Sequence, residues 1–377
     1  MDLVRAYRTI GQVYNLIQAE RRTRSSFEVA LGDRPWLYRH GFLSKSGEIY
    51  SLDLNGPEEY LTDYQRFVRT TRINGSQWNT LIDNKLAFHR LLGEFPTHRP
   101  AVYGLLTDGE LHVYDRTDGR SVMTDGGLKL EHPSEPASEQ PTTEPVTWIA
   151  DALSDGDRLV LKRFRGSDRT DVHFLERVGE EYVFDGTRMS EAALAKTLTT
   201  FDGYLLCEHV EQADYAAELF PHTTNTIRVL TMYDDREREA FIPMAIHRIG
   251  TTDSAPVDTF SDGGMSARID RETGELGEAV KYPTDGTVDW HRTHPDSGAR
   301  IRGTDVPGWS RVRDQLLEIA EMYSHIPYVG WDLVVTDEGG FEIIGAHSHP
   351  NVAPLQVHEP LLADDRTRRF YRDHDVI

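Results

Sequence analysis

Lysine is scarce in this chain, which makes each lysine a candidate for a chemical role. Of the 41 basic residues only six are lysines, at Lys45, Lys85, Lys129, Lys162, Lys196 and Lys281. A lysine ammonium is a compact charge on a flexible stem, so it suits contact with a phosphate oxygen. The alternative for any one of them is a surface ion pair, worth about 0–1 kcal/mol.

Two arginines lie in a predicted strand pair. Apolar residues predict strands over 226–233 and 240–248, with Asp234 and Asp235 at the turn between them. Arg228 lies in the first strand, where an unpaired charge would be costly, so an anionic partner is expected for it. Arg248 ends the second strand. Guanidinium groups clamp a transferred phosphoryl group or an acyl phosphate well, and a structural salt bridge to a protein carboxylate is the competing interpretation.

A short glycine-rich segment follows these strands. Residues 261–264 read Ser-Asp-Gly-Gly, and the backbone amides of Gly263 and Gly264 could approach a substrate or a phosphate. Ser261 and the preceding Asp258 are candidates for substrate contact, and Asp258 is also a candidate metal ligand. The alternative for the segment is a plain turn.

The C-terminal part carries the candidate metal ligands. Asp332 follows Gly330 and Trp331 in a predicted strand over 329–336. Imidazole suits zinc, manganese or iron, so a transition-metal site is an alternative for three histidines, His347, His349 and His358.

The elements that must position these residues alternate between helix and strand. Helical spacing predicts helices over 2–24, around 81–92, over 190–200 with Ser190 as cap, and over 307–323. Strands are predicted to start at Val102 and over 158–164, 181–185 and 340–344. Residues 131–146 are rich in proline, serine and glutamate, which predicts a flexible linker or surface loop. This mixture favours an α+β fold built from α/β lobes.

The amino-acid composition limits the kinds of molecule that the protein is expected to bind and the compartment in which it is expected to work. The formal net charge of -21 disfavours nucleic acid, whose phosphates are held by positive surfaces. An acidic, arginine-rich surface is typical of salt-adapted cytoplasmic proteins, with skewed codon usage as the alternative. One cysteine, Cys207, fits a reducing compartment and is predicted to be a core residue. No membrane span or signal peptide is expected. The first predicted helix ends in basic residues. It is expected to pack on the first lobe as a solvated helix, and contact of its basic end with a membrane surface or a partner is the alternative.

Five segments together resemble one known family in their order and spacing. They are 81–90 with Tyr103-Gly104, 159–162 with Gly166-Ser167, 203–210, 225–229 with His247-Arg248, and a run of motifs over 257–264, 294–298, 307–309 and 330–332. This pattern resembles the sugar-transfer-associated branch of the ATP-grasp superfamily, and it extends over about residues 75–360. The resemblance implies an ATP-grasp fold with a nucleotide cleft between two antiparallel sheets, preceded by an N-terminal α/β lobe.

The resemblance also implies a division of the chain. The expected parts are an N-terminal helical or α+β region (1–75), a first α/β lobe (76–130), the linker (131–146), an ATP-grasp small subdomain (147–210) and a large subdomain (211–377).

The implied activity is ATP-dependent ligation of a carboxylate to an amine through an acyl phosphate. In the family, lysines on opposite lobes contact phosphates, and Lys85 and Lys162 match them. Glu208, Val210 and Asn225 match residues near the nucleotide, with an exposed strand residue as the alternative for Glu208. Arg228 and Arg248 would be catalytic. Asp332 and His347 stand at the metal positions, for magnesium, or for manganese or another divalent ion.

The sequence departs from the family at two places. Gly345 stands where the family has a metal-binding glutamate, and His347 replaces an asparagine; Glu342 lies too early in its strand to substitute. The loop after Lys162 has fewer glycines and carries Arg165, Asp168, Arg169 and Asp171.

Three functions therefore stay open. The first is an active ligase, joining an amine to a sugar-linked acid in polysaccharide or glycoconjugate modification. The second is a degenerate protein that binds nucleotide or sugar without turnover. The third is a structural protein without a nucleotide site, which the retained Lys162, Arg228 and Asp332 oppose. For the active ligase, Asp332→Asn is expected to abolish magnesium-dependent turnover and to spare the melting temperature.

Overall fold

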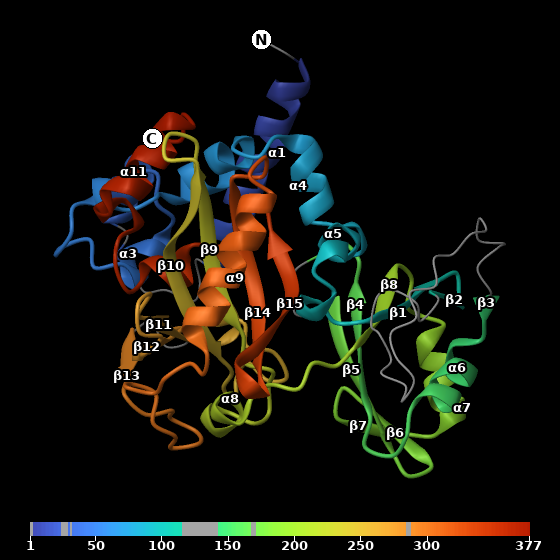
Figure 1. Ribbon diagram of the computed structural model, residues 1–377. Coiled ribbons are helices and arrows are strands. Elements are labelled where there is room, and N and C mark those ends of the chain that lie inside the picture. The colour runs from blue at the N-terminus through green and yellow to red at the C-terminus, as the bar shows by residue number, and fades with distance from the viewer. Residues whose placement is uncertain (1–2, 24–28, 31, 115–141, 167–170, 284–287) are drawn as a thin grey trace. The chain divides into compact units, whose positions relative to one another are not determined.

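The structure is a computed structural model that describes residues 3–23, 29–30, 32–114, 142–166, 171–283 and 288–377. The chain packs as two compact units, which we describe separately (Figure 1). Unit 1 comprises Met1–Ile82, Glu211–Phe341 and Gly345–Ile377, and unit 2 comprises Asp83–Val210 with Glu342–Ile344. Unit 1 is therefore assembled from three pieces of sequence, whereas unit 2 is nearly continuous.

Unit 2 is built on an eight-stranded antiparallel sheet. Its strand order is β3-β2-β1-β8-β4-β5-β6-β7. The strands are β1 (Val102–Thr107), β2 (Glu110–Val113), β3 (Thr142–Thr143), β4 (Arg158–Arg163), β5 (Val172–Val178), β6 (Glu181–Phe184), β7 (Thr187–Met189) and β8 (Tyr204–Glu208). Helices α6 (Pro145–Ala152) and α7 (Glu191–Leu198) pack on this sheet through a shared apolar core that includes Ile149, Leu161, Leu175 and Leu194.

Unit 1 is built on a seven-stranded antiparallel sheet. Its order is β13-β12-β11-β10-β9-β14-β15. The strands are β9 (Ile227–Asp234), β10 (Glu239–Ile249), β11 (Met265–Ile269), β12 (Leu276–Lys281), β13 (Asp289–His291), β14 (Tyr328–Thr336) and β15 (Gly340–His347). Helix α9 (Trp309–Met322) packs on this sheet through one buried face, and α8 (Asp214–Leu219) precedes β9. The central strands β9 and β14 are buried along almost their whole length, as expected for strands covered on both faces.

Both ends of the chain complete unit 1. The N-terminal helices are α1 (Leu3–Thr23), α2 (Arg34–Arg39), α3 (Ser44–Ile49), α4 (Ser76–Ile82) and a π-helical turn, η2 (Gln65–Arg69). The C-terminal helices are α10 (Ala353–Gln356) and α11 (Asp365–Asp373). One apolar cluster contains Leu61 from the N-terminal part together with Leu355 and Phe370 from the C-terminal part. The Gln356 side chain bonds both the N–H and the C=O of Leu61.

Most predicted elements are present, with one clear error. Ser190 Oγ caps α7 by accepting from the Ala193 N–H, and Cys207 is buried, both as predicted. The single helix predicted around 81–92 is wrong: α4 ends at Ile82, and α5 (Lys85–Leu91) begins three residues later. Asn84 causes the break, because its side chain accepts from the Leu86 and Ala87 N–H groups as the cap of α5.

The layout of the N-terminal half differs in detail from the expected lobes. The described residues before Ile82 form helices and turns without a strand, so the strands of the expected N-terminal α/β lobe begin only at β1. Strands β1 and β2 pair in the same sheet as β4–β8, which joins the segments 76–130 and 147–210. Of the expected linker 131–146, residues 131–141 lie outside the described residues, Thr142–Thr143 forms β3, and α6 begins at Pro145.

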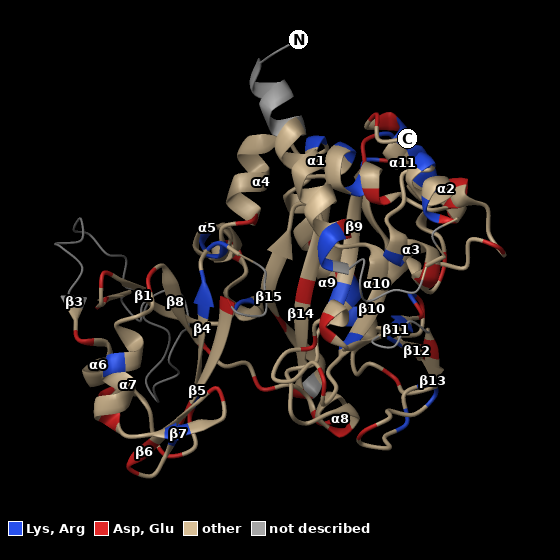
Figure 2. Ribbon diagram, turned by 180° about the vertical axis from the view of Figure 1, so that it is seen from behind, with Lys and Arg blue, Asp and Glu red and all other residues tan. Residues whose placement is uncertain are grey.

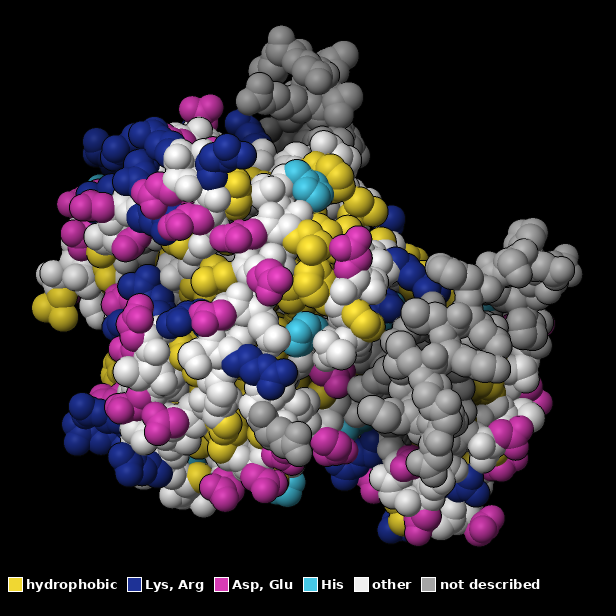
Figure 3. Space-filling model, viewed as in Figure 1, with side chains coloured by type: hydrophobic (Ala, Val, Ile, Leu, Met, Phe, Trp, Pro, Cys, Tyr) yellow, Lys and Arg dark blue, Asp and Glu magenta, His cyan; other side chains and the backbone are white. Residues whose placement is uncertain are grey.

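Charged residues are distributed along the chain of both units (Figure 2). On the face of the molecule seen in Figure 3, acidic and basic side chains are interspersed, and basic ones gather at the end that carries α11. No helix in the described part of the chain has the length and hydropathy that crossing a membrane requires.

Candidate functional site

The site in unit 1 is centred on an ion pair between neighbouring strands. Arg228 on β9 stands directly opposite Asp332 on β14 in the register of the sheet. The guanidinium is bidentate: Nε donates to Asp332 Oδ1, and a terminal nitrogen donates to Asp332 Oδ2 at 2.9 Å. Arg228 is 5% exposed and Asp332 is 8% exposed, so the pair is withdrawn from water. The structural salt bridge left open for Arg228 is therefore present.

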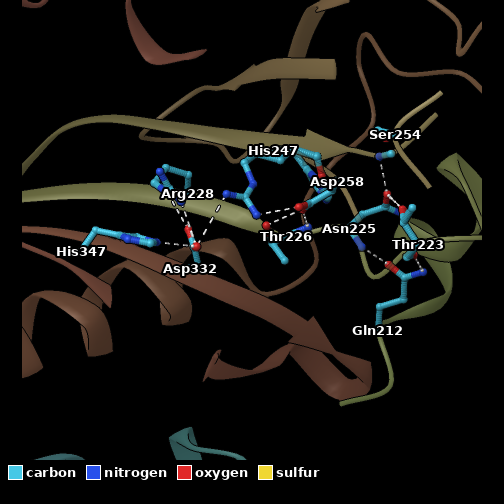
Figure 4. Close-up of polar contacts among 12 residues, drawn as sticks. Gln212, Thr223, Asn225, Thr226, Arg228, His247, Ser254, Asp258, Asp332 and His347 are labelled. Atoms are coloured by element: carbon cyan, nitrogen blue, oxygen red, sulfur yellow. Dashed lines mark hydrogen bonds and ion pairs between the residues drawn. The ribbon is translucent and has the colours of Figure 1, made fainter. Parts of the chain in front are cut away.

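Arg248 extends this pair into a network. Figure 4 shows Arg228, Asp332, Asp258 and Thr226, which belong to it. Its guanidinium donates to Asp258 Oδ1 at 2.6 Å and lies 3.6 Å from Asp332 Oδ2. The other oxygen of Asp258 accepts from the backbone N–H and the hydroxyl of Thr226. Two guanidinium groups thus face two carboxylates, and the charges of the network balance. Arg248 Nε is buried, and no acceptor for it is present among the described residues.

His347 is the third described partner of the Asp332 carboxylate. Its Nε2 lies 3.1 Å from Asp332 Oδ2, and the side chain is 30% exposed, more than any other member of the network. Burial and the Arg228 charge lower the pKa of His347. Although burial opposes ionisation of Asp332, the Arg228 and Arg248 charges hold its pKa well below the usual value. Asp332 is therefore an ionised carboxylate whose oxygens are shared among Arg228, Arg248 and His347.

This environment does not fit a divalent metal ion. A cation at Asp332 would face two guanidinium charges, and magnesium requires several oxygen ligands in near-octahedral array. Gly345, on the same face of β15 as His347 by strand alternation, offers no ligand, and Glu342 points to the opposite face. In the described residues no group of three or more His, Cys, Asp or Glu side chains is arranged to hold a metal.

The histidines of the alternative transition-metal site have separate partners. His349 Nδ1 lies 2.7 Å from Ser348 Oγ, and His358 Nε2 lies 2.9 Å from Ser266 Oγ. Burial lowers the pKa of His358 to about 3, so it is neutral. These contacts give no support to a shared metal ion.

Neighbouring groups of the protein form hydrogen bonds with Asn225 and with the glycine-rich segment. The Asn225 amide donates to two carbonyls, of Ala216 and Phe220, and its oxygen accepts from Thr223 Oγ1 and the Gly250 N–H. The amides of Gly263 and Gly264 donate to the carbonyls of Phe260 and Thr259, so the segment forms a turn around Gly263 with φ 98°. Ser261 is exposed. The hydrogen-bonding groups proposed for ligand contact at Asn225, Gly263 and Gly264 are thus already used.

Unit 2 brings the two candidate lysines together. Lys85 is the first residue of α5, and its Nζ donates to the carbonyls of Arg163, at 3.0 Å, and Gly166 just after β4. Lys162 lies on β4 itself. Burial raises the pKa of the Cys207 thiol, while the Lys162 and Lys85 charges act against this rise. In the sheet Lys162 stands opposite Leu205 and Arg163 opposite Tyr204, so both lysines lie by the end of β4 that faces the start of β8.

The expectation that these lysines lie on opposite lobes is wrong. The Lys85 N–H donates to the Phe164 carbonyl, and Asn84 pairs with Arg165, so the start of α5 is tied to the segment after β4. Glu208 ends β8, where its Oε2 accepts from the Ala101 N–H, and Val210 is buried two residues later. Loop residues 167–170 lie outside the described residues.

Sequence reasoning missed two residues that hold the unit 1 network in place. Thr226 binds Asp258 through two groups, and Gln212 accepts from the Asn225 N–H and donates to the Thr223 carbonyl. Figure 4 shows these contacts as two groups, one from His347 to Thr226 and one around Asn225, which the chain joins between Asn225 and Thr226. Neither residue type carries a distinctive signal, because threonine and glutamine are common polar residues.

Solved structures similar to this chain share little sequence with it. D-alanyl-alanine synthetase A from Vibrio cholerae is 11% identical, with a TM-score of 0.40, over 86% of this chain and 69% of that chain. L-amino acid ligase from Bacillus licheniformis is 9% identical, with a TM-score of 0.36, over 77% of this chain. N5-carboxyaminoimidazole ribonucleotide synthetase from Thermotoga maritima is 10% identical, with a TM-score of 0.37, over 79% of this chain. The alignments span about half of the last two proteins, 48% and 50%.

No curated protein matches the chain. Residues 65–368, by contrast, match a family described as sugar-transfer associated ATP-grasp. The match extends through the candidate residues of both units, from Lys85 to His347. The chain therefore belongs to the sugar-transfer associated ATP-grasp family.

Proposed function

We propose that this protein is an ATP-dependent carboxylate ligase that modifies a polysaccharide or glycoconjugate precursor. In the proposed reaction a carboxylate oxygen attacks the γ-phosphorus of ATP, and ADP leaves. An amine then attacks the acyl carbon, inorganic phosphate leaves, and the amine loses a proton. The single cysteine suits a cytoplasmic location, which we include in the proposal.

The observation that carries this proposal is the unsatisfied donor of Arg248. A buried N–H without an acceptor is rare and costs about 1–3 kcal/mol, so a ligand oxygen or a water is expected there. Arg248 is held by Asp258 and Asp332, which leaves Nε to bind an oxygen of the substrate acid or its acyl phosphate. The carboxylates would orient the guanidinium without removing this donor.

The nucleotide phosphates are assigned to Lys85 and Lys162 of unit 2. Lys85 donates to two neutral backbone carbonyls, of Arg163 and Gly166, which direct its ammonium group. An ammonium held in this way suits a phosphate oxygen, and positioning with charge neutralisation is most of what phosphoryl transfer requires of a protein.

A second candidate function is nucleotide binding without turnover. It is favoured by Asp332, whose carboxylate is surrounded by Arg228, Arg248 and His347, and by Gly345, which provides no carboxylate. A protein of this kind would bind ATP with little dependence on magnesium.

Calorimetry with ATP, in the presence and absence of magnesium and in molar potassium chloride, separates the two functions. We expect Lys162→Ala to weaken ATP binding about tenfold or more, with the matched surface variant Lys196→Ala unchanged. Magnesium-dependent binding followed by ADP release with an acid and an amine would establish the ligase. Binding without magnesium dependence and without ADP release would establish the second function, and equal affinities of the two variants would remove Lys162 from the site.

A further inference from the structure

Helix α1 carries a row of apolar side chains that the rest of unit 1 leaves uncovered. Ile10, Tyr14 and Ile17 are 67%, 59% and 46% exposed. Their spacing of four and three residues places them on one side of the helix, because residues three and four apart are neighbours on a helix surface. The row is therefore open to solvent over about two helical turns.

The opposite side of α1 is packed on the protein. Gln12 Nε2 donates to Thr71 Oγ1 at 2.6 Å, and Glu20 accepts from the backbone N–H and the hydroxyl of Ser44. These polar contacts hold α1 along two different segments of unit 1. The apolar row is thus presented by a helix that the protein holds in place.

Helix α2 adds to the same surface. The Tyr38 side chain is 46% exposed, and its Oη donates to Glu20 Oε1 at 2.6 Å, which brings α2 beside α1. Of the eleven large apolar side chains that are exposed in the described part of the chain, five lie on α1 and α2, Trp36 included. The side chains that we call the N-terminal apolar surface are Ile10, Tyr14, Ile17 and Tyr38.

The charge of this region is opposite to that of the remaining chain. Residues 1–40 hold 7 of the 41 basic residues and 4 of the 62 acidic ones, so they carry a net charge of +3 and the other residues carry -24. Arg21 continues the apolar row four residues after Ile17, and Arg22 follows it; both are exposed. Neither forms an ion pair with a carboxylate among the described residues. A negatively charged surface would be attracted to α1 and repelled by the rest of the protein.

A second copy of this chain does not suit the N-terminal apolar surface. A twofold interface brings the same patch of two copies together, so two positively charged segments would meet. The row from Ile10 to Arg21 contains no carboxylate that could pair with an arginine of the other copy. An anionic lipid surface, by contrast, offers hydrocarbon to the apolar side chains and phosphate to the arginines.

We propose that the N-terminal apolar surface binds the protein to a membrane surface that carries anionic phospholipids. α1 lies along this surface, with Ile10 and Ile17 entering the boundary between headgroups and acyl chains. Tyr14 and Tyr38 suit the headgroup level, where amphipathic aromatic rings gather, and Arg21 contacts phosphate. This goes beyond the proposed function, because it concerns where the protein works, and neither proposal depends on the other.

Co-sedimentation of the full chain with lipid vesicles tests the surface. Vesicles of phosphatidylcholine alone are compared with vesicles that also contain about 30% phosphatidylglycerol, in about 0.1 M potassium chloride, where charges are screened beyond about 10 Å. We expect the partition coefficient to be at least about tenfold higher for the vesicles with phosphatidylglycerol. Raising the potassium chloride concentration to about 1 M should remove most of this difference.

Two double variants separate the apolar and the charged contributions. Ile10→Ser with Ile17→Ser should weaken binding to the phosphatidylglycerol vesicles about tenfold or more, because two apolar side chains no longer leave water. Arg21→Gln with Arg22→Gln should remove most of the preference for phosphatidylglycerol over phosphatidylcholine. All four residues are exposed, so both variants should keep the circular dichroism spectrum of the wild type.

Matched controls come from α9, which also belongs to unit 1. Met322→Ser removes an apolar side chain that is 47% exposed, and Arg311→Gln removes an exposed arginine. Both variants should bind vesicles like the wild type, and weaker binding of either to the same degree as the α1 variants would overturn the assignment to α1. Absent binding, or equal binding to the two kinds of vesicle, would overturn the membrane contact.

Sedimentation velocity of the protein without lipid tests the alternative occupant. We expect a monomer. A dimer that Ile10→Ser with Ile17→Ser dissociates would assign the N-terminal apolar surface to a second copy and overturn our proposal. The ATP affinity of the α1 variants should equal that of the wild type, so failure of ATP binding bears on the proposed function alone.

Discussion

The positively charged candidate site residues of unit 1 and of unit 2 donate to different kinds of group. In unit 1, Arg228 and Arg248 face Asp332 and Asp258, so the positive charges are neutralised by carboxylates. In unit 2, Lys85 donates to the carbonyls of Arg163 and Gly166, which orient the ammonium group but carry no formal charge.

This difference shows that a charged residue at a motif position can have either of two physical roles. A carboxylate partner turns a cation into a structural and orienting group, which presents only its remaining donors, such as Arg248 Nε. A carbonyl partner orients a cation without itself cancelling the charge. The comparison predicts that substitutions in unit 1 mainly change stability and that those at the unit 2 lysines mainly change nucleotide affinity.

The largest effect is expected for Asp332→Asn. The substitution leaves the buried Arg228 guanidinium beside a neutral amide, and breaking one partner of a buried pair costs about 3–5 kcal/mol. The structure thus reverses the expectation that this variant spares the melting temperature. Urea unfolding would measure the loss, with Asp314→Asn, in an exposed pair with Arg313, as the control.

The pH dependence of Asp332 gives the sign of its contribution. Its folded-state pKa lies well below the usual value, so its stabilisation is present above about pH 4 and is lost as the pH falls through the lower folded pKa. The wild type should therefore lose more stability in acid than Asp332→Asn does. Equal stability of the two proteins at pH 7 would show that the ion pair contributes nothing net.

The next effect concerns a buried histidine next to Arg248. Burial lowers the pKa of His247 to about 4, and its ring contacts Tyr215 Oη at 3.0 Å. The unfolded chain takes up a proton near pH 6.5 and the folded chain does not, so stability is full above pH 6.5 and falls toward pH 4. The change is about 3 kcal/mol.

Unfolding free energies at pH 7.5 and pH 5 measure this contribution. His247→Gln should show a smaller drop between the two pH values than the wild type, and His222→Gln, at an exposed position, should show the same drop as the wild type. An unchanged drop in His247→Gln would mean that this ring is not the group that titrates.

The smallest effect is expected at Gly345. A Cβ added there meets no heavy atom within 4 Å, so Gly345→Ala should change the free energy of unfolding by no more than about 0.5 kcal/mol. Gly345→Glu then adds a carboxylate on the face that carries His347. If magnesium raises the melting temperature of Gly345→Glu but not of the wild type, unit 1 lacks only this ligand. Magnesium stabilisation of both proteins would contradict our description of Asp332.

Local patterns predicted the elements well, and partners across the sheet poorly. The cap at Ser190 and the strands around Arg228 follow from neighbouring residues, and both are present. The partner of Arg228 is Asp332, 104 positions later, and only the strand order β10-β9-β14 brings the two together. A sequence reveals that Arg228 needs an anion, but not whether the protein or a ligand supplies it.

The error at Asn84 has a similar origin. The apolar spacing from Leu81 to Leu92 fits one helix, yet Asn84 offers its side chain to two backbone amides and starts a new one. Apolar periodicity reports which residues are buried, but it does not report where a helix begins. The hydrogen bonds of the Asn84 side chain to backbone amides favour a new helix start over a continuous helix.

The three-piece construction of unit 1 has a consequence for synthesis on the ribosome. Unit 2 is almost complete once Val210 has emerged, and its sheet can form at that point from nearby sequence. The N-terminal helices must wait, because Leu61 shares its core and its hydrogen bonds with residues beyond 350. Their apolar faces remain exposed through nearly the whole of translation, when aggregation competes with folding. Removing the last two dozen residues would leave unit 2 able to fold and unit 1 permanently unfinished.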